Sequence, residues 1–170
     1  MKKFLVAALA GVMAASMLFT GCGKKEESKV PDKIIVGTNA EFPPFEYMDN
    51  QKKPDGFDIA MIKEIGKRMN KKVEIQNMEF KSLIGAMESG SINSIIAGMT
   101  KTKEREQSVD FSDSYYTSNQ AIILKKDSKI TKLSQLSGKK IGVQEGTTGD
   151  IISSGEKFGE KNKTIVKRSE

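Results

Sequence analysis

The chain has 170 residues, of which 28 are basic and 22 acidic, so its formal net charge is +6. With no histidine and a single cysteine, it lacks the side chains of a Ser-His-Asp or Cys-His nucleophile and of a His/Cys metal cage, and a disulfide within one chain is impossible. Basic residues are interspersed with acidic ones and form no stripe with aromatic residues, which argues against nucleic-acid binding. We therefore expect no catalytic residues of these kinds, no metal and no cofactor.

The first residues are typical of an export signal. Lys2 and Lys3 precede an uncharged stretch, residues 4–23. An uncleaved membrane anchor is the alternative, because about 20 apolar residues can just span a bilayer. Gly11 and Ser16 within the stretch make it a poor span, so removal of the signal is the preferred interpretation.

The end of this stretch holds the only cysteine. Residues 18–22 (Leu-Phe-Thr-Gly-Cys) resemble a bacterial lipoprotein processing site, in which the cysteine is lipidated and becomes the mature N-terminus. Phe19 departs from that pattern, since an aliphatic residue is usual at its position. We predict a lipoprotein signal peptide at residues 1–21, lipidation of Cys22, and a charged, lipid-anchored tether at residues 22–31.

The first folded part is predicted to alternate strands and helices. Residues 34–36 form a short apolar run typical of a strand, and Pro43 and Pro44 interrupt the loop that follows. Apolar residues at spacings of three and four over residues 59–69 predict an amphipathic helix, with Asp58 as its N-cap. The order β-α-β-α-β then predicts a parallel sheet with right-handed crossovers. Its remaining elements are an extended piece at 46–48, a strand at 73–76, a helix at 82–89 and a strand at 94–97.

The last of these strands runs into residues 98–105 (Gly-Met-Thr-Lys-Thr-Lys-Glu-Arg), which we interpret as a carboxylate clamp. Ligands of open α/β sheets bind at the carboxyl ends of such strands. Gly98 lets a ligand approach backbone N–H groups that we expect to be free, and Thr100 offers a hydroxyl. Thr102 can cap a short helix that carries Arg105, whose guanidinium matches a carboxylate. The alternative is a capped surface helix with a solvated arginine.

A second loop of the same kind follows in the C-terminal half, beyond a predicted strand at 120–124. Gly146, Thr147 and Thr148 precede a predicted helix at 150–158, where free N–H groups and the helix dipole favour an anion. The two threonines could equally form a plain helix cap. Two such loops, one in each half, predict a two-lobed protein that closes on an acidic small molecule. Between them we expect a polar link at 125–132, a short helix at 133–136 and a strand at 140–143.

Five separated motifs agree with one family. In order and spacing they resemble the polar amino-acid family (family 3) of bacterial extracellular solute-binding proteins of ABC transporters. The resemblance covers residues 34 to about 168 and implies an α/β, two-lobed fold of the type II periplasmic-binding-protein-like kind. Ala60 departs from the family pattern, where an acid is usual, and we expect it to face solvent or a hinge contact. The motifs are residues 37–47 (GTNAEFPPFEY), 56–59 (GFDI), 98–105, 110–112 (DFS) and 146–148 (GTT).

The resemblance also implies roles for single residues. Arg105 would pair with the α-carboxylate of an amino acid, while the Gly98 backbone and Thr100 hold its carboxylate and amino group. Phe42 and Phe80 would form aromatic walls beside the ligand, because rings supply apolar surface at low entropy cost. The predicted ligand-binding residues are Asn39, Glu41, Phe42, Phe80, Gly98, Met99, Thr100, Arg105, Thr147 and Thr148.

Three further expectations concern the walls and the preference of this site. Asn39 and Glu41 would lie where preference for the ligand side chain is set, and Glu41 could attract a cationic one. Thr147 and Thr148 would close on the ligand from the second lobe. For Phe45 we expect core packing rather than a place in the cleft.

The resemblance divides the chain into a first lobe at residues 32–119, a hinge crossing strand at 120–124 and the first part of a second lobe at 125–170. The family's second-lobe aspartate, which meets the ligand's ammonium group, would fall after Glu170, as would the strand that returns to the first lobe. We therefore expect a chain that is truncated at its C-terminus. A second lobe of one or two strands buries little core, so the chain as written should bind weakly or not at all.

The predicted function is the substrate-binding component of an amino-acid ABC transporter. It would capture a polar or basic L-amino acid outside the membrane and deliver it to the permease subunits by closure about the hinge. We expect a monomer, lipid-anchored at the extracytoplasmic face of the cell membrane, and no enzyme. One alternative is a dehydratase-like enzyme of the same fold with Glu41 or Glu145 as an acid. Another is the ligand-sensing module of a larger signalling or wall-modifying protein.

Overall fold

A computed structural model describes residues 31–154 and 165–169 of the chain. The predicted signal peptide and the predicted lipidation site at Cys22 lie outside the described residues, as does nearly all of the predicted tether. Within the described part, no helix combines the length and the apolar character that crossing a membrane requires.

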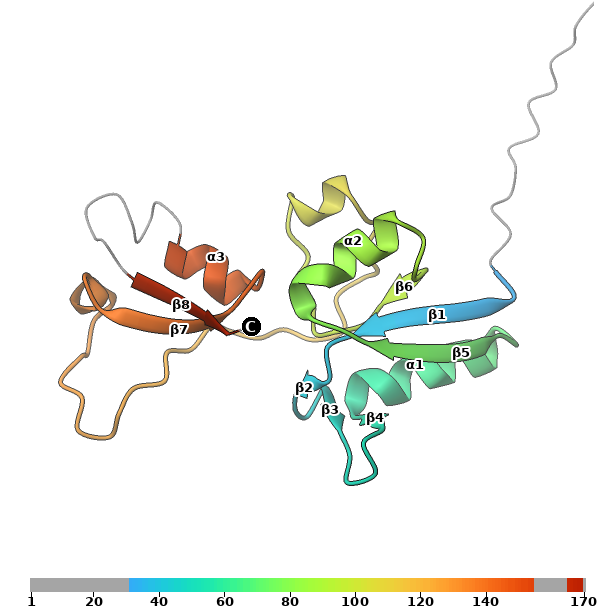
Figure 1. Ribbon diagram of the computed structural model, residues 1–170, viewed down its shortest axis with the longest axis horizontal. Helices are drawn as coiled ribbons and strands as arrows, with labels where there is room; N and C mark the ends of the chain where they lie inside the picture. The colour runs from blue at the N-terminus through green and yellow to red at the C-terminus, as the bar shows by residue number, and fades with distance from the viewer. Residues whose placement is uncertain (1–30, 155–164, 170) are drawn as a thin grey trace, which may run out of the picture. The chain divides into compact units, whose positions relative to one another are not determined.

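A parallel three-stranded sheet forms the centre of the N-terminal part (Figure 1). Its strands are β1 (Lys33–Thr38), β5 (Lys72–Asn77) and β6 (Ser94–Ile95), in the order β5-β1-β6. Lys33 pairs with Lys72 at one end of β1, and Val36 pairs with Ser94. The parallel sheet predicted from the β-α-β-α-β order is therefore confirmed. Of the strand predicted at 94–97, only the first two residues pair with β1.

Two helices cover opposite faces of this sheet (Figure 1). The chain moves from β1 to β5 and then back across β1 to β6, and right-handed crossovers in opposite directions place their helices on opposite faces. The first crossover carries α1 (Phe57–Arg68), and the second carries the 3₁₀ turn η1 (Phe80–Ser82) and α2 (Leu83–Glu88).

The core lies between the sheet and these helices. Each large aliphatic side chain that is fully buried there stabilises the fold by about 1.5–3 kcal/mol. The apolar spacing over residues 59–69 predicts α1, whose Ile59 and Ile62 are buried. The main buried aliphatic residues are Ile34, Val36, Ile59, Ile62, Leu83, Ile92 and Ile96.

A small antiparallel sheet follows β1 at the carboxyl end of the central sheet. It consists of β2 (Glu41–Phe42), β3 (Glu46–Met48) and β4 (Pro54–Asp55). The N–H groups of Phe57 and Asp58, in the first turn of α1, donate to the carbonyl oxygens of Pro44 and Phe45 at 3.0 and 2.9 Å. The start of α1 is thus fixed to the loop between β2 and β3.

The prediction that Asp58 is the N-cap of α1 is wrong. The N-cap is Gly56, and no side chain caps this helix end. Asp58 lies inside the first turn and is fully buried, because its carboxylate accepts hydrogen bonds from more distant parts of the chain. Ala60 is exposed to solvent, as expected.

The C-terminal part contains a second parallel β-α-β arrangement. After the 3₁₀ turns η2 (Arg105–Gln107) and η3 (Leu133–Leu136) come β7 (Lys140–Gln144), α3 (Thr148–Ser154) and β8 (Ile165–Ser169). The strands β7 and β8 pair in parallel, with Lys140 opposite Ile165. The predicted short helix at 133–136 and the predicted strand at 140–143 are both present.

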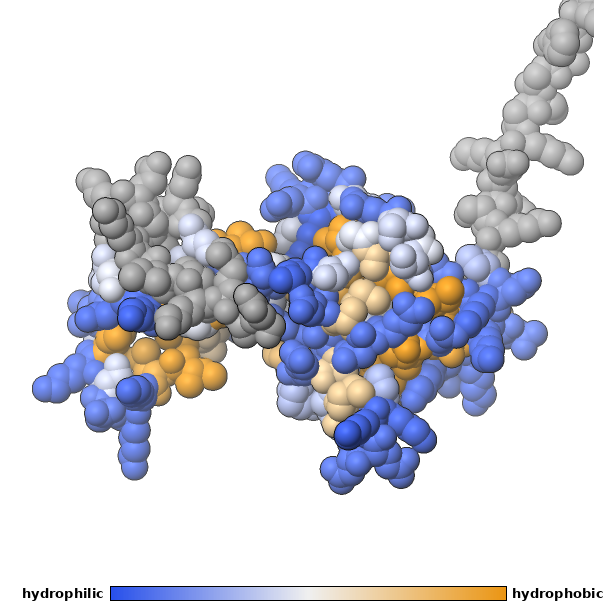
Figure 2. Space-filling model, in the orientation of Figure 1, coloured by the Kyte–Doolittle hydropathy of each residue, from blue (hydrophilic) through white to orange (hydrophobic). Residues whose placement is uncertain are grey.

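The strand predicted at 120–124 is not formed. A strand requires a neighbour for its backbone hydrogen bonds, and no described strand pairs with this segment. Its apolar side chains lie at the surface, with Ile123 97% exposed. Figure 2 shows apolar side chains on the visible surface of this C-terminal part. The exposed ones are Ile122, Ile123, Leu124, Leu133, Ile151 and Ile152.

Replacing Gly85 by alanine is expected to raise the free energy of unfolding by about 0.5–1 kcal/mol. Gly85 lies inside α2, and a Cβ atom built on it meets no atom within 4 Å, so alanine removes backbone entropy from the unfolded chain without a clash. Urea denaturation followed by circular dichroism measures the change. Ala60→Gly, at an exposed position of α1, is the matched reverse change and should lower stability by a similar amount. A Gly85→Ala variant less stable than wild type would contradict the expectation.

Candidate functional site

The loop that leaves β6 forms one side of the candidate site. Ile96 and Ala97 are buried, and the chain turns at Gly98, whose φ of +52° favours glycine. We expected the Gly98 N–H to be free, but it donates to Asp58 Oδ2 at 2.8 Å. Within the described part of the chain, the N–H groups of Met99 and Thr100 and the Thr100 hydroxyl have no hydrogen-bond partner. These three groups are therefore the donors that the loop presents.

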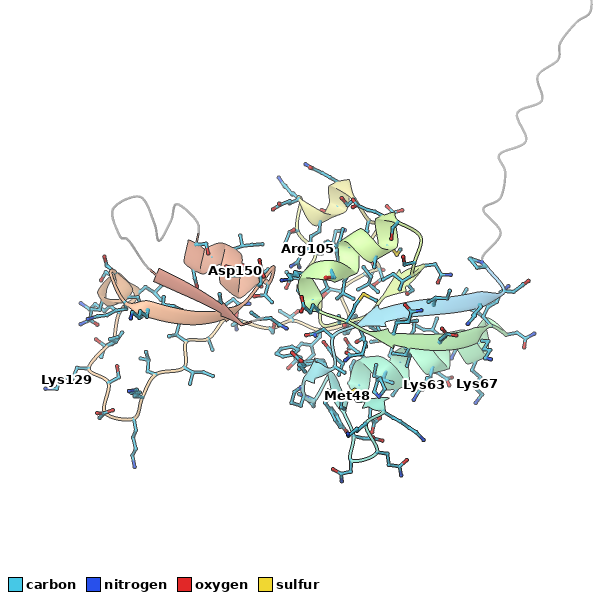
Figure 3. All side chains as sticks on the ribbon, viewed as in Figure 1. Met48, Lys63, Lys67, Arg105, Lys129 and Asp150 are labelled. Atoms are coloured by element: carbon cyan, nitrogen blue, oxygen red, sulfur yellow. The ribbon has the colours of Figure 1, made fainter. Side chains whose placement is uncertain are left out.

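Arg105 is the central charged residue of the site (Figure 3). Its side chain is only 7% exposed, so the alternative of a solvated surface arginine is wrong. Nη1 donates to the Thr100 carbonyl oxygen at 2.6 Å, and Nη2 donates to the Gly146 carbonyl oxygen at 2.9 Å. The guanidinium carbon lies 5.3 Å from the centre of the Phe80 ring, within the range of a cation–π interaction.

No carboxylate of the described residues forms an ion pair with Arg105, although burying a charge without an opposite one is costly. Burial lowers the pKa of Arg105, but an arginine stays charged at neutral pH in any protein environment. A buried guanidinium held only by carbonyl oxygens is therefore suited to receive an anion.

The short turn that carries Arg105 is stabilised as the sequence indicates. The Arg105 N–H donates to Thr102 Oγ1 at 3.2 Å, so Thr102 satisfies one of the unpaired N–H groups at the start of η2. The residue at the N-cap position itself is Glu104, whose side chain makes no capping bond. Thr102 thus fixes the backbone of Arg105 relative to the Gly98 loop.

The second loop behaves differently from the prediction. Thr147 Oγ1 donates to the Gln144 carbonyl oxygen at 2.8 Å and accepts from the Asp150 N–H at 3.2 Å, so its side chain is a helix cap. Gln120 Nε2 donates to Thr148 Oγ1 at 2.8 Å. The expectation of free N–H groups fails at Gly146, whose N–H donates to Asp150 Oδ2 at 3.0 Å. An aspartate in the first turn of α3 satisfies this donor from inside the chain.

Polar contacts link the 144–148 loop with residues of the N-terminal part. Besides the bond from Arg105 to Gly146, Gln144 Nε2 donates to Asn39 Oδ1 at 2.7 Å, and Lys81 Nζ lies 2.9 Å from Glu145 Oε2. The structure therefore brings the 98–105 loop and the 144–148 loop into contact. Sequence reasoning missed Gln144 and Lys81, since neither carries a pattern that sets it apart from ordinary surface residues.

The predicted walls lie close to the Gly98 loop. Phe42, on β2, is 53% exposed and stacks on Phe45 with ring centres 5.5 Å apart. A Cβ atom built on Gly98 would lie 3.2 Å from Phe42 Cδ1, so the Phe42 ring is next to the loop. Phe80 is half-buried beside Arg105. Phe45, for which we expected core packing, is half-buried and packs in an aromatic cluster with Phe42, Phe57 and Tyr116.

The two residues expected to set ligand preference differ in exposure. Asn39 is buried, and its Nδ2 donates to the Met78 carbonyl oxygen at 3.0 Å. Glu41, on β2 next to Phe42, is exposed. Within the described residues, no three His, Cys, Asp or Glu side chains gather in an arrangement that could hold a metal ion.

Comparison with known families gives one match that spans most of the chain. The model of the bacterial extracellular solute-binding proteins, family 3, matches residues 34–169. The arginine-binding extracellular protein ArtP of Bacillus subtilis (strain 168) is 40% identical over 86% of this chain and 57% of its own length. A probable histidine-binding protein of Neisseria gonorrhoeae is 36% identical over 89% of this chain and 58% of its own length.

Solved structures show the same relationship. An ancestral arginine-binding protein bound to arginine is 43% identical, with a TM-score of 0.77, over 82% of this chain and 61% of that one. The holo arginine-binding protein ArgBP of T. maritima is 40% identical, with a TM-score of 0.73, over 81% of this chain and 60% of its own. The chain thus spans somewhat more than half the length of these relatives.

Proposed function

Because the chain belongs to the bacterial extracellular solute-binding proteins of family 3, we propose that it serves as the substrate-binding component of an amino-acid ABC transporter. It captures a polar or basic L-amino acid outside the membrane and delivers it to the permease subunits. The observation that carries this proposal is the buried Arg105 guanidinium, which has no carboxylate partner in the described chain and lies beside free N–H groups. An α-carboxylate supplies the missing negative charge.

Each side of the site takes a separate part in binding. Arg105 receives the α-carboxylate together with the Met99 and Thr100 N–H groups and the Thr100 hydroxyl. The Phe42 and Phe80 rings flank the ligand and supply apolar surface. Asn39, Thr147 and Thr148 act mainly through neighbours, since the structure engages their side chains in hydrogen bonds with the protein.

Among amino acids, we propose L-arginine as the preferred ligand and L-histidine as the second candidate. The relatives named above include an arginine-binding and a probable histidine-binding protein. The exposed Glu41 supports a cationic side chain by placing negative charge at the edge of the site. Glu145 is already paired with Lys81 at 2.9 Å, and the same lysine also pairs with Glu79 at 3.3 Å.

Closure of two lobes about the segment 120–124 completes the proposed mechanism. The bonds from Arg105 to Gly146 and from Gln144 to Asn39 support it, because through them the 144–148 loop contacts the 98–105 loop and the residue that follows β1. Binding involves no bond making or breaking in this proposal. The protein acts as a monomer, anchored by lipidated Cys22 at the extracytoplasmic face of the cell membrane.

A thermal-shift panel tests the function. The protein, expressed as its gene encodes it with any residues beyond Glu170, is heated with L-arginine, L-histidine, L-lysine, L-glutamine, L-glutamate and agmatine. L-Arginine at 100 times its Kd should add about 2.7 kcal/mol to the free energy of unfolding and raise Tm. Agmatine, which is arginine without its carboxylate, should raise Tm far less. No shift of Tm with any amino acid would refute the proposal. If mass spectrometry shows that the amino acid disappears during incubation with the protein, the enzyme alternative is favoured.

A further inference from the structure

Two carboxyl groups are buried directly behind the Gly98 loop. Glu46 on β3 is 1% exposed, and Asp58 in the first turn of α1 is fully buried. Neither forms an ion pair with a lysine or arginine of the described residues. Burial of two acids without a cation is costly unless hydrogen bonds or protonation compensate for it.

Asp58 acts as a hydrogen-bond acceptor for the loop. Its Oδ2 accepts from the Gly98 N–H at 2.8 Å and from the Tyr115 hydroxyl at 2.9 Å. Burial, followed by the charge of Asp58, raises the pKa of Tyr115, so this hydroxyl is a donor at neutral pH. An ionised carboxylate accepts both bonds, and its negative charge also suits the first turn of α1.

One carboxyl oxygen of Glu46 and one of Asp58 lack a hydrogen-bond donor in the described part of the chain, and a proton can supply it. Asp58 Oδ1 and Glu46 Oε2 are both buried and have no hydrogen-bond partner among the described residues. Burial, then the charge of Asp58 and a hydrogen bond with it, raises the pKa of Glu46 from 4.5 to about 9. Glu46 is therefore neutral at pH 7, and its proton can satisfy an oxygen of each carboxyl group.

The ionisable groups around Glu46 make its neutral form the favoured one. Asp58 from α1 and Tyr115 from the later segment face it, and Glu41 on β2 and Asp55 on β4 are the exposed acids of the flanking strands. Of these groups, Asp58 is the one whose charge opposes a second buried negative charge at Glu46, because the Tyr115 hydroxyl is neutral at neutral pH. Loss of the proton would set two carboxylates against each other beneath the loop.

We propose that Glu46 and Asp58 are positioning residues that share one proton, so that Asp58 stays an acceptor and holds Gly98 in place. The fixed Gly98 in turn places the Met99 and Thr100 N–H groups where the ligand's carboxylate is received. This last clause rests on the proposed function, whereas the proton sharing and the hold on Gly98 do not. Ionisation of Glu46 releases the loop, so the geometry of the site depends on pH through a residue that touches no ligand.

NMR spectroscopy of the ligand-free full chain tests the first part. The side-chain carboxyl carbon of Glu46 is expected to report a neutral acid at pH 7 and to titrate near pH 9, and the Gly98 amide resonance should follow the same titration. Glu46→Gln keeps the hydrogen bond without a titrating group, so its Gly98 resonance should not titrate there. Asp55→Asn, an exposed acid on the flanking strand, is the control and should leave the Gly98 titration intact. An ionised Glu46 at pH 7, or a Gly98 resonance that ignores the titration, would overturn the proposal.

Stability gives a second measure of the same proton. Because the folded pKa of Glu46 lies above its ordinary value, the native chain retains a proton that the unfolded chain releases between pH 4.5 and about 9. The stability that this proton contributes is present below pH 4.5 and is lost as the pH rises through that window. The difference in Tm between wild type and Glu46→Gln should therefore shift in favour of the variant as the pH rises from 5 to 9. An unchanged difference would count against the proposal.

Calorimetric binding of L-arginine tests the last clause. Between pH 7 and 9.5 the affinity of wild type should fall about tenfold further than that of Glu46→Gln, because the comparison cancels the titration of the ligand's own amino group. Asp58→Asn should weaken binding about tenfold at pH 7. Equal pH dependence in wild type and Glu46→Gln would overturn this clause. Since the NMR measurement contains no ligand, failure of the chain to bind any amino acid would refute the proposed function without touching the proton sharing.

Discussion

Replacing Arg105 by alanine is expected to weaken binding of L-arginine at least about 30-fold, which corresponds to about 2 kcal/mol or more. The guanidinium is 7% exposed and held by two carbonyl oxygens, so it meets the ligand already desolvated and oriented. A ligand carboxylate that enters the variant leaves water without gaining an opposite charge. Arg105→Lys should recover only part of the affinity, since an ammonium group cannot reproduce the two-pronged geometry. Isothermal titration calorimetry at pH 7 measures both variants.

The control for this experiment removes a guanidinium from elsewhere. Arg68 pairs with Glu64 one turn before it on α1, with 2.8 Å between Nε and Oε1, and its side chain is 79% exposed. Arg68→Ala should leave binding unchanged. Agmatine separates the lost carboxylate contact from a general distortion, because its weak binding should be equal in wild type and Arg105→Ala. An Arg105→Ala variant that binds L-arginine as wild type does, or that loses agmatine to the same extent as L-arginine, would contradict the role assigned to Arg105.

Local patterns were sufficient for the family, the type II fold and much of the first lobe. The match over residues 34–169 and the similarity to solved arginine-binding proteins confirm the family and the fold that the five motifs indicate. The apolar run at 34–36 and the spacing over 59–69 predict β1 and α1, because burial of one face leaves a periodic trace in the sequence. Arg105 follows the end of β6 and is buried, and its role as the partner of a ligand carboxylate stays a prediction.

Long-range hydrogen bonds account for what the sequence did not show. Asp58 has the position and chemistry of an N-cap, but its acceptor pairs with Gly98 and Tyr115, which lie 40 and 57 residues further along the chain. The same bond removes the Gly98 N–H from the predicted set of free donors. Glu46 is an acid in a short strand between two half-buried residues, Phe45 and Tyr47, and nothing in its neighbours signals complete burial. Such partners become visible only when the sheet and α1 are packed together.

The segment 120–124 shows a different limit. Its β-branched, apolar residues favour a strand, but a strand forms only where a neighbour accepts and donates its backbone hydrogen bonds. In the described chain β7 pairs with β8, and residues 120–124 have no strand beside them. The β propensity of these residues is high, but they form no strand because no neighbouring strand among the described residues pairs with them. The hinge role of this segment stays a prediction.

Replacing Gly56 by alanine is expected to lower the free energy of unfolding of the chain by about 3 kcal/mol or more. Gly56 has a φ of +120°, and a Cβ atom there would lie 2.4 Å from the Phe45 carbonyl oxygen and 2.9 Å from that of Pro44. Both contacts are with backbone, which cannot move aside as a flexible side chain can. Urea denaturation followed by circular dichroism measures the loss.

Gly90→Ala is the matched control, because it separates backbone strain from the clash. Gly90 also has a positive φ, of +75°, but a Cβ atom on it meets nothing within 4 Å, so its cost should be only about 1–2 kcal/mol. The two carbonyl oxygens at Gly56 are also the acceptors for the Phe57 and Asp58 N–H groups, so the clash forces the start of α1 away from the loop between β2 and β3. Asp58 would then move relative to Gly98, and the Gly98 amide resonance should shift in Gly56→Ala but not in Gly90→Ala. The contrary result is an equal loss of stability in Gly56→Ala and Gly90→Ala, with the Gly98 amide resonance unchanged in both. It would show that the turn at Gly56 does not couple the fold of the first lobe to the geometry of the site.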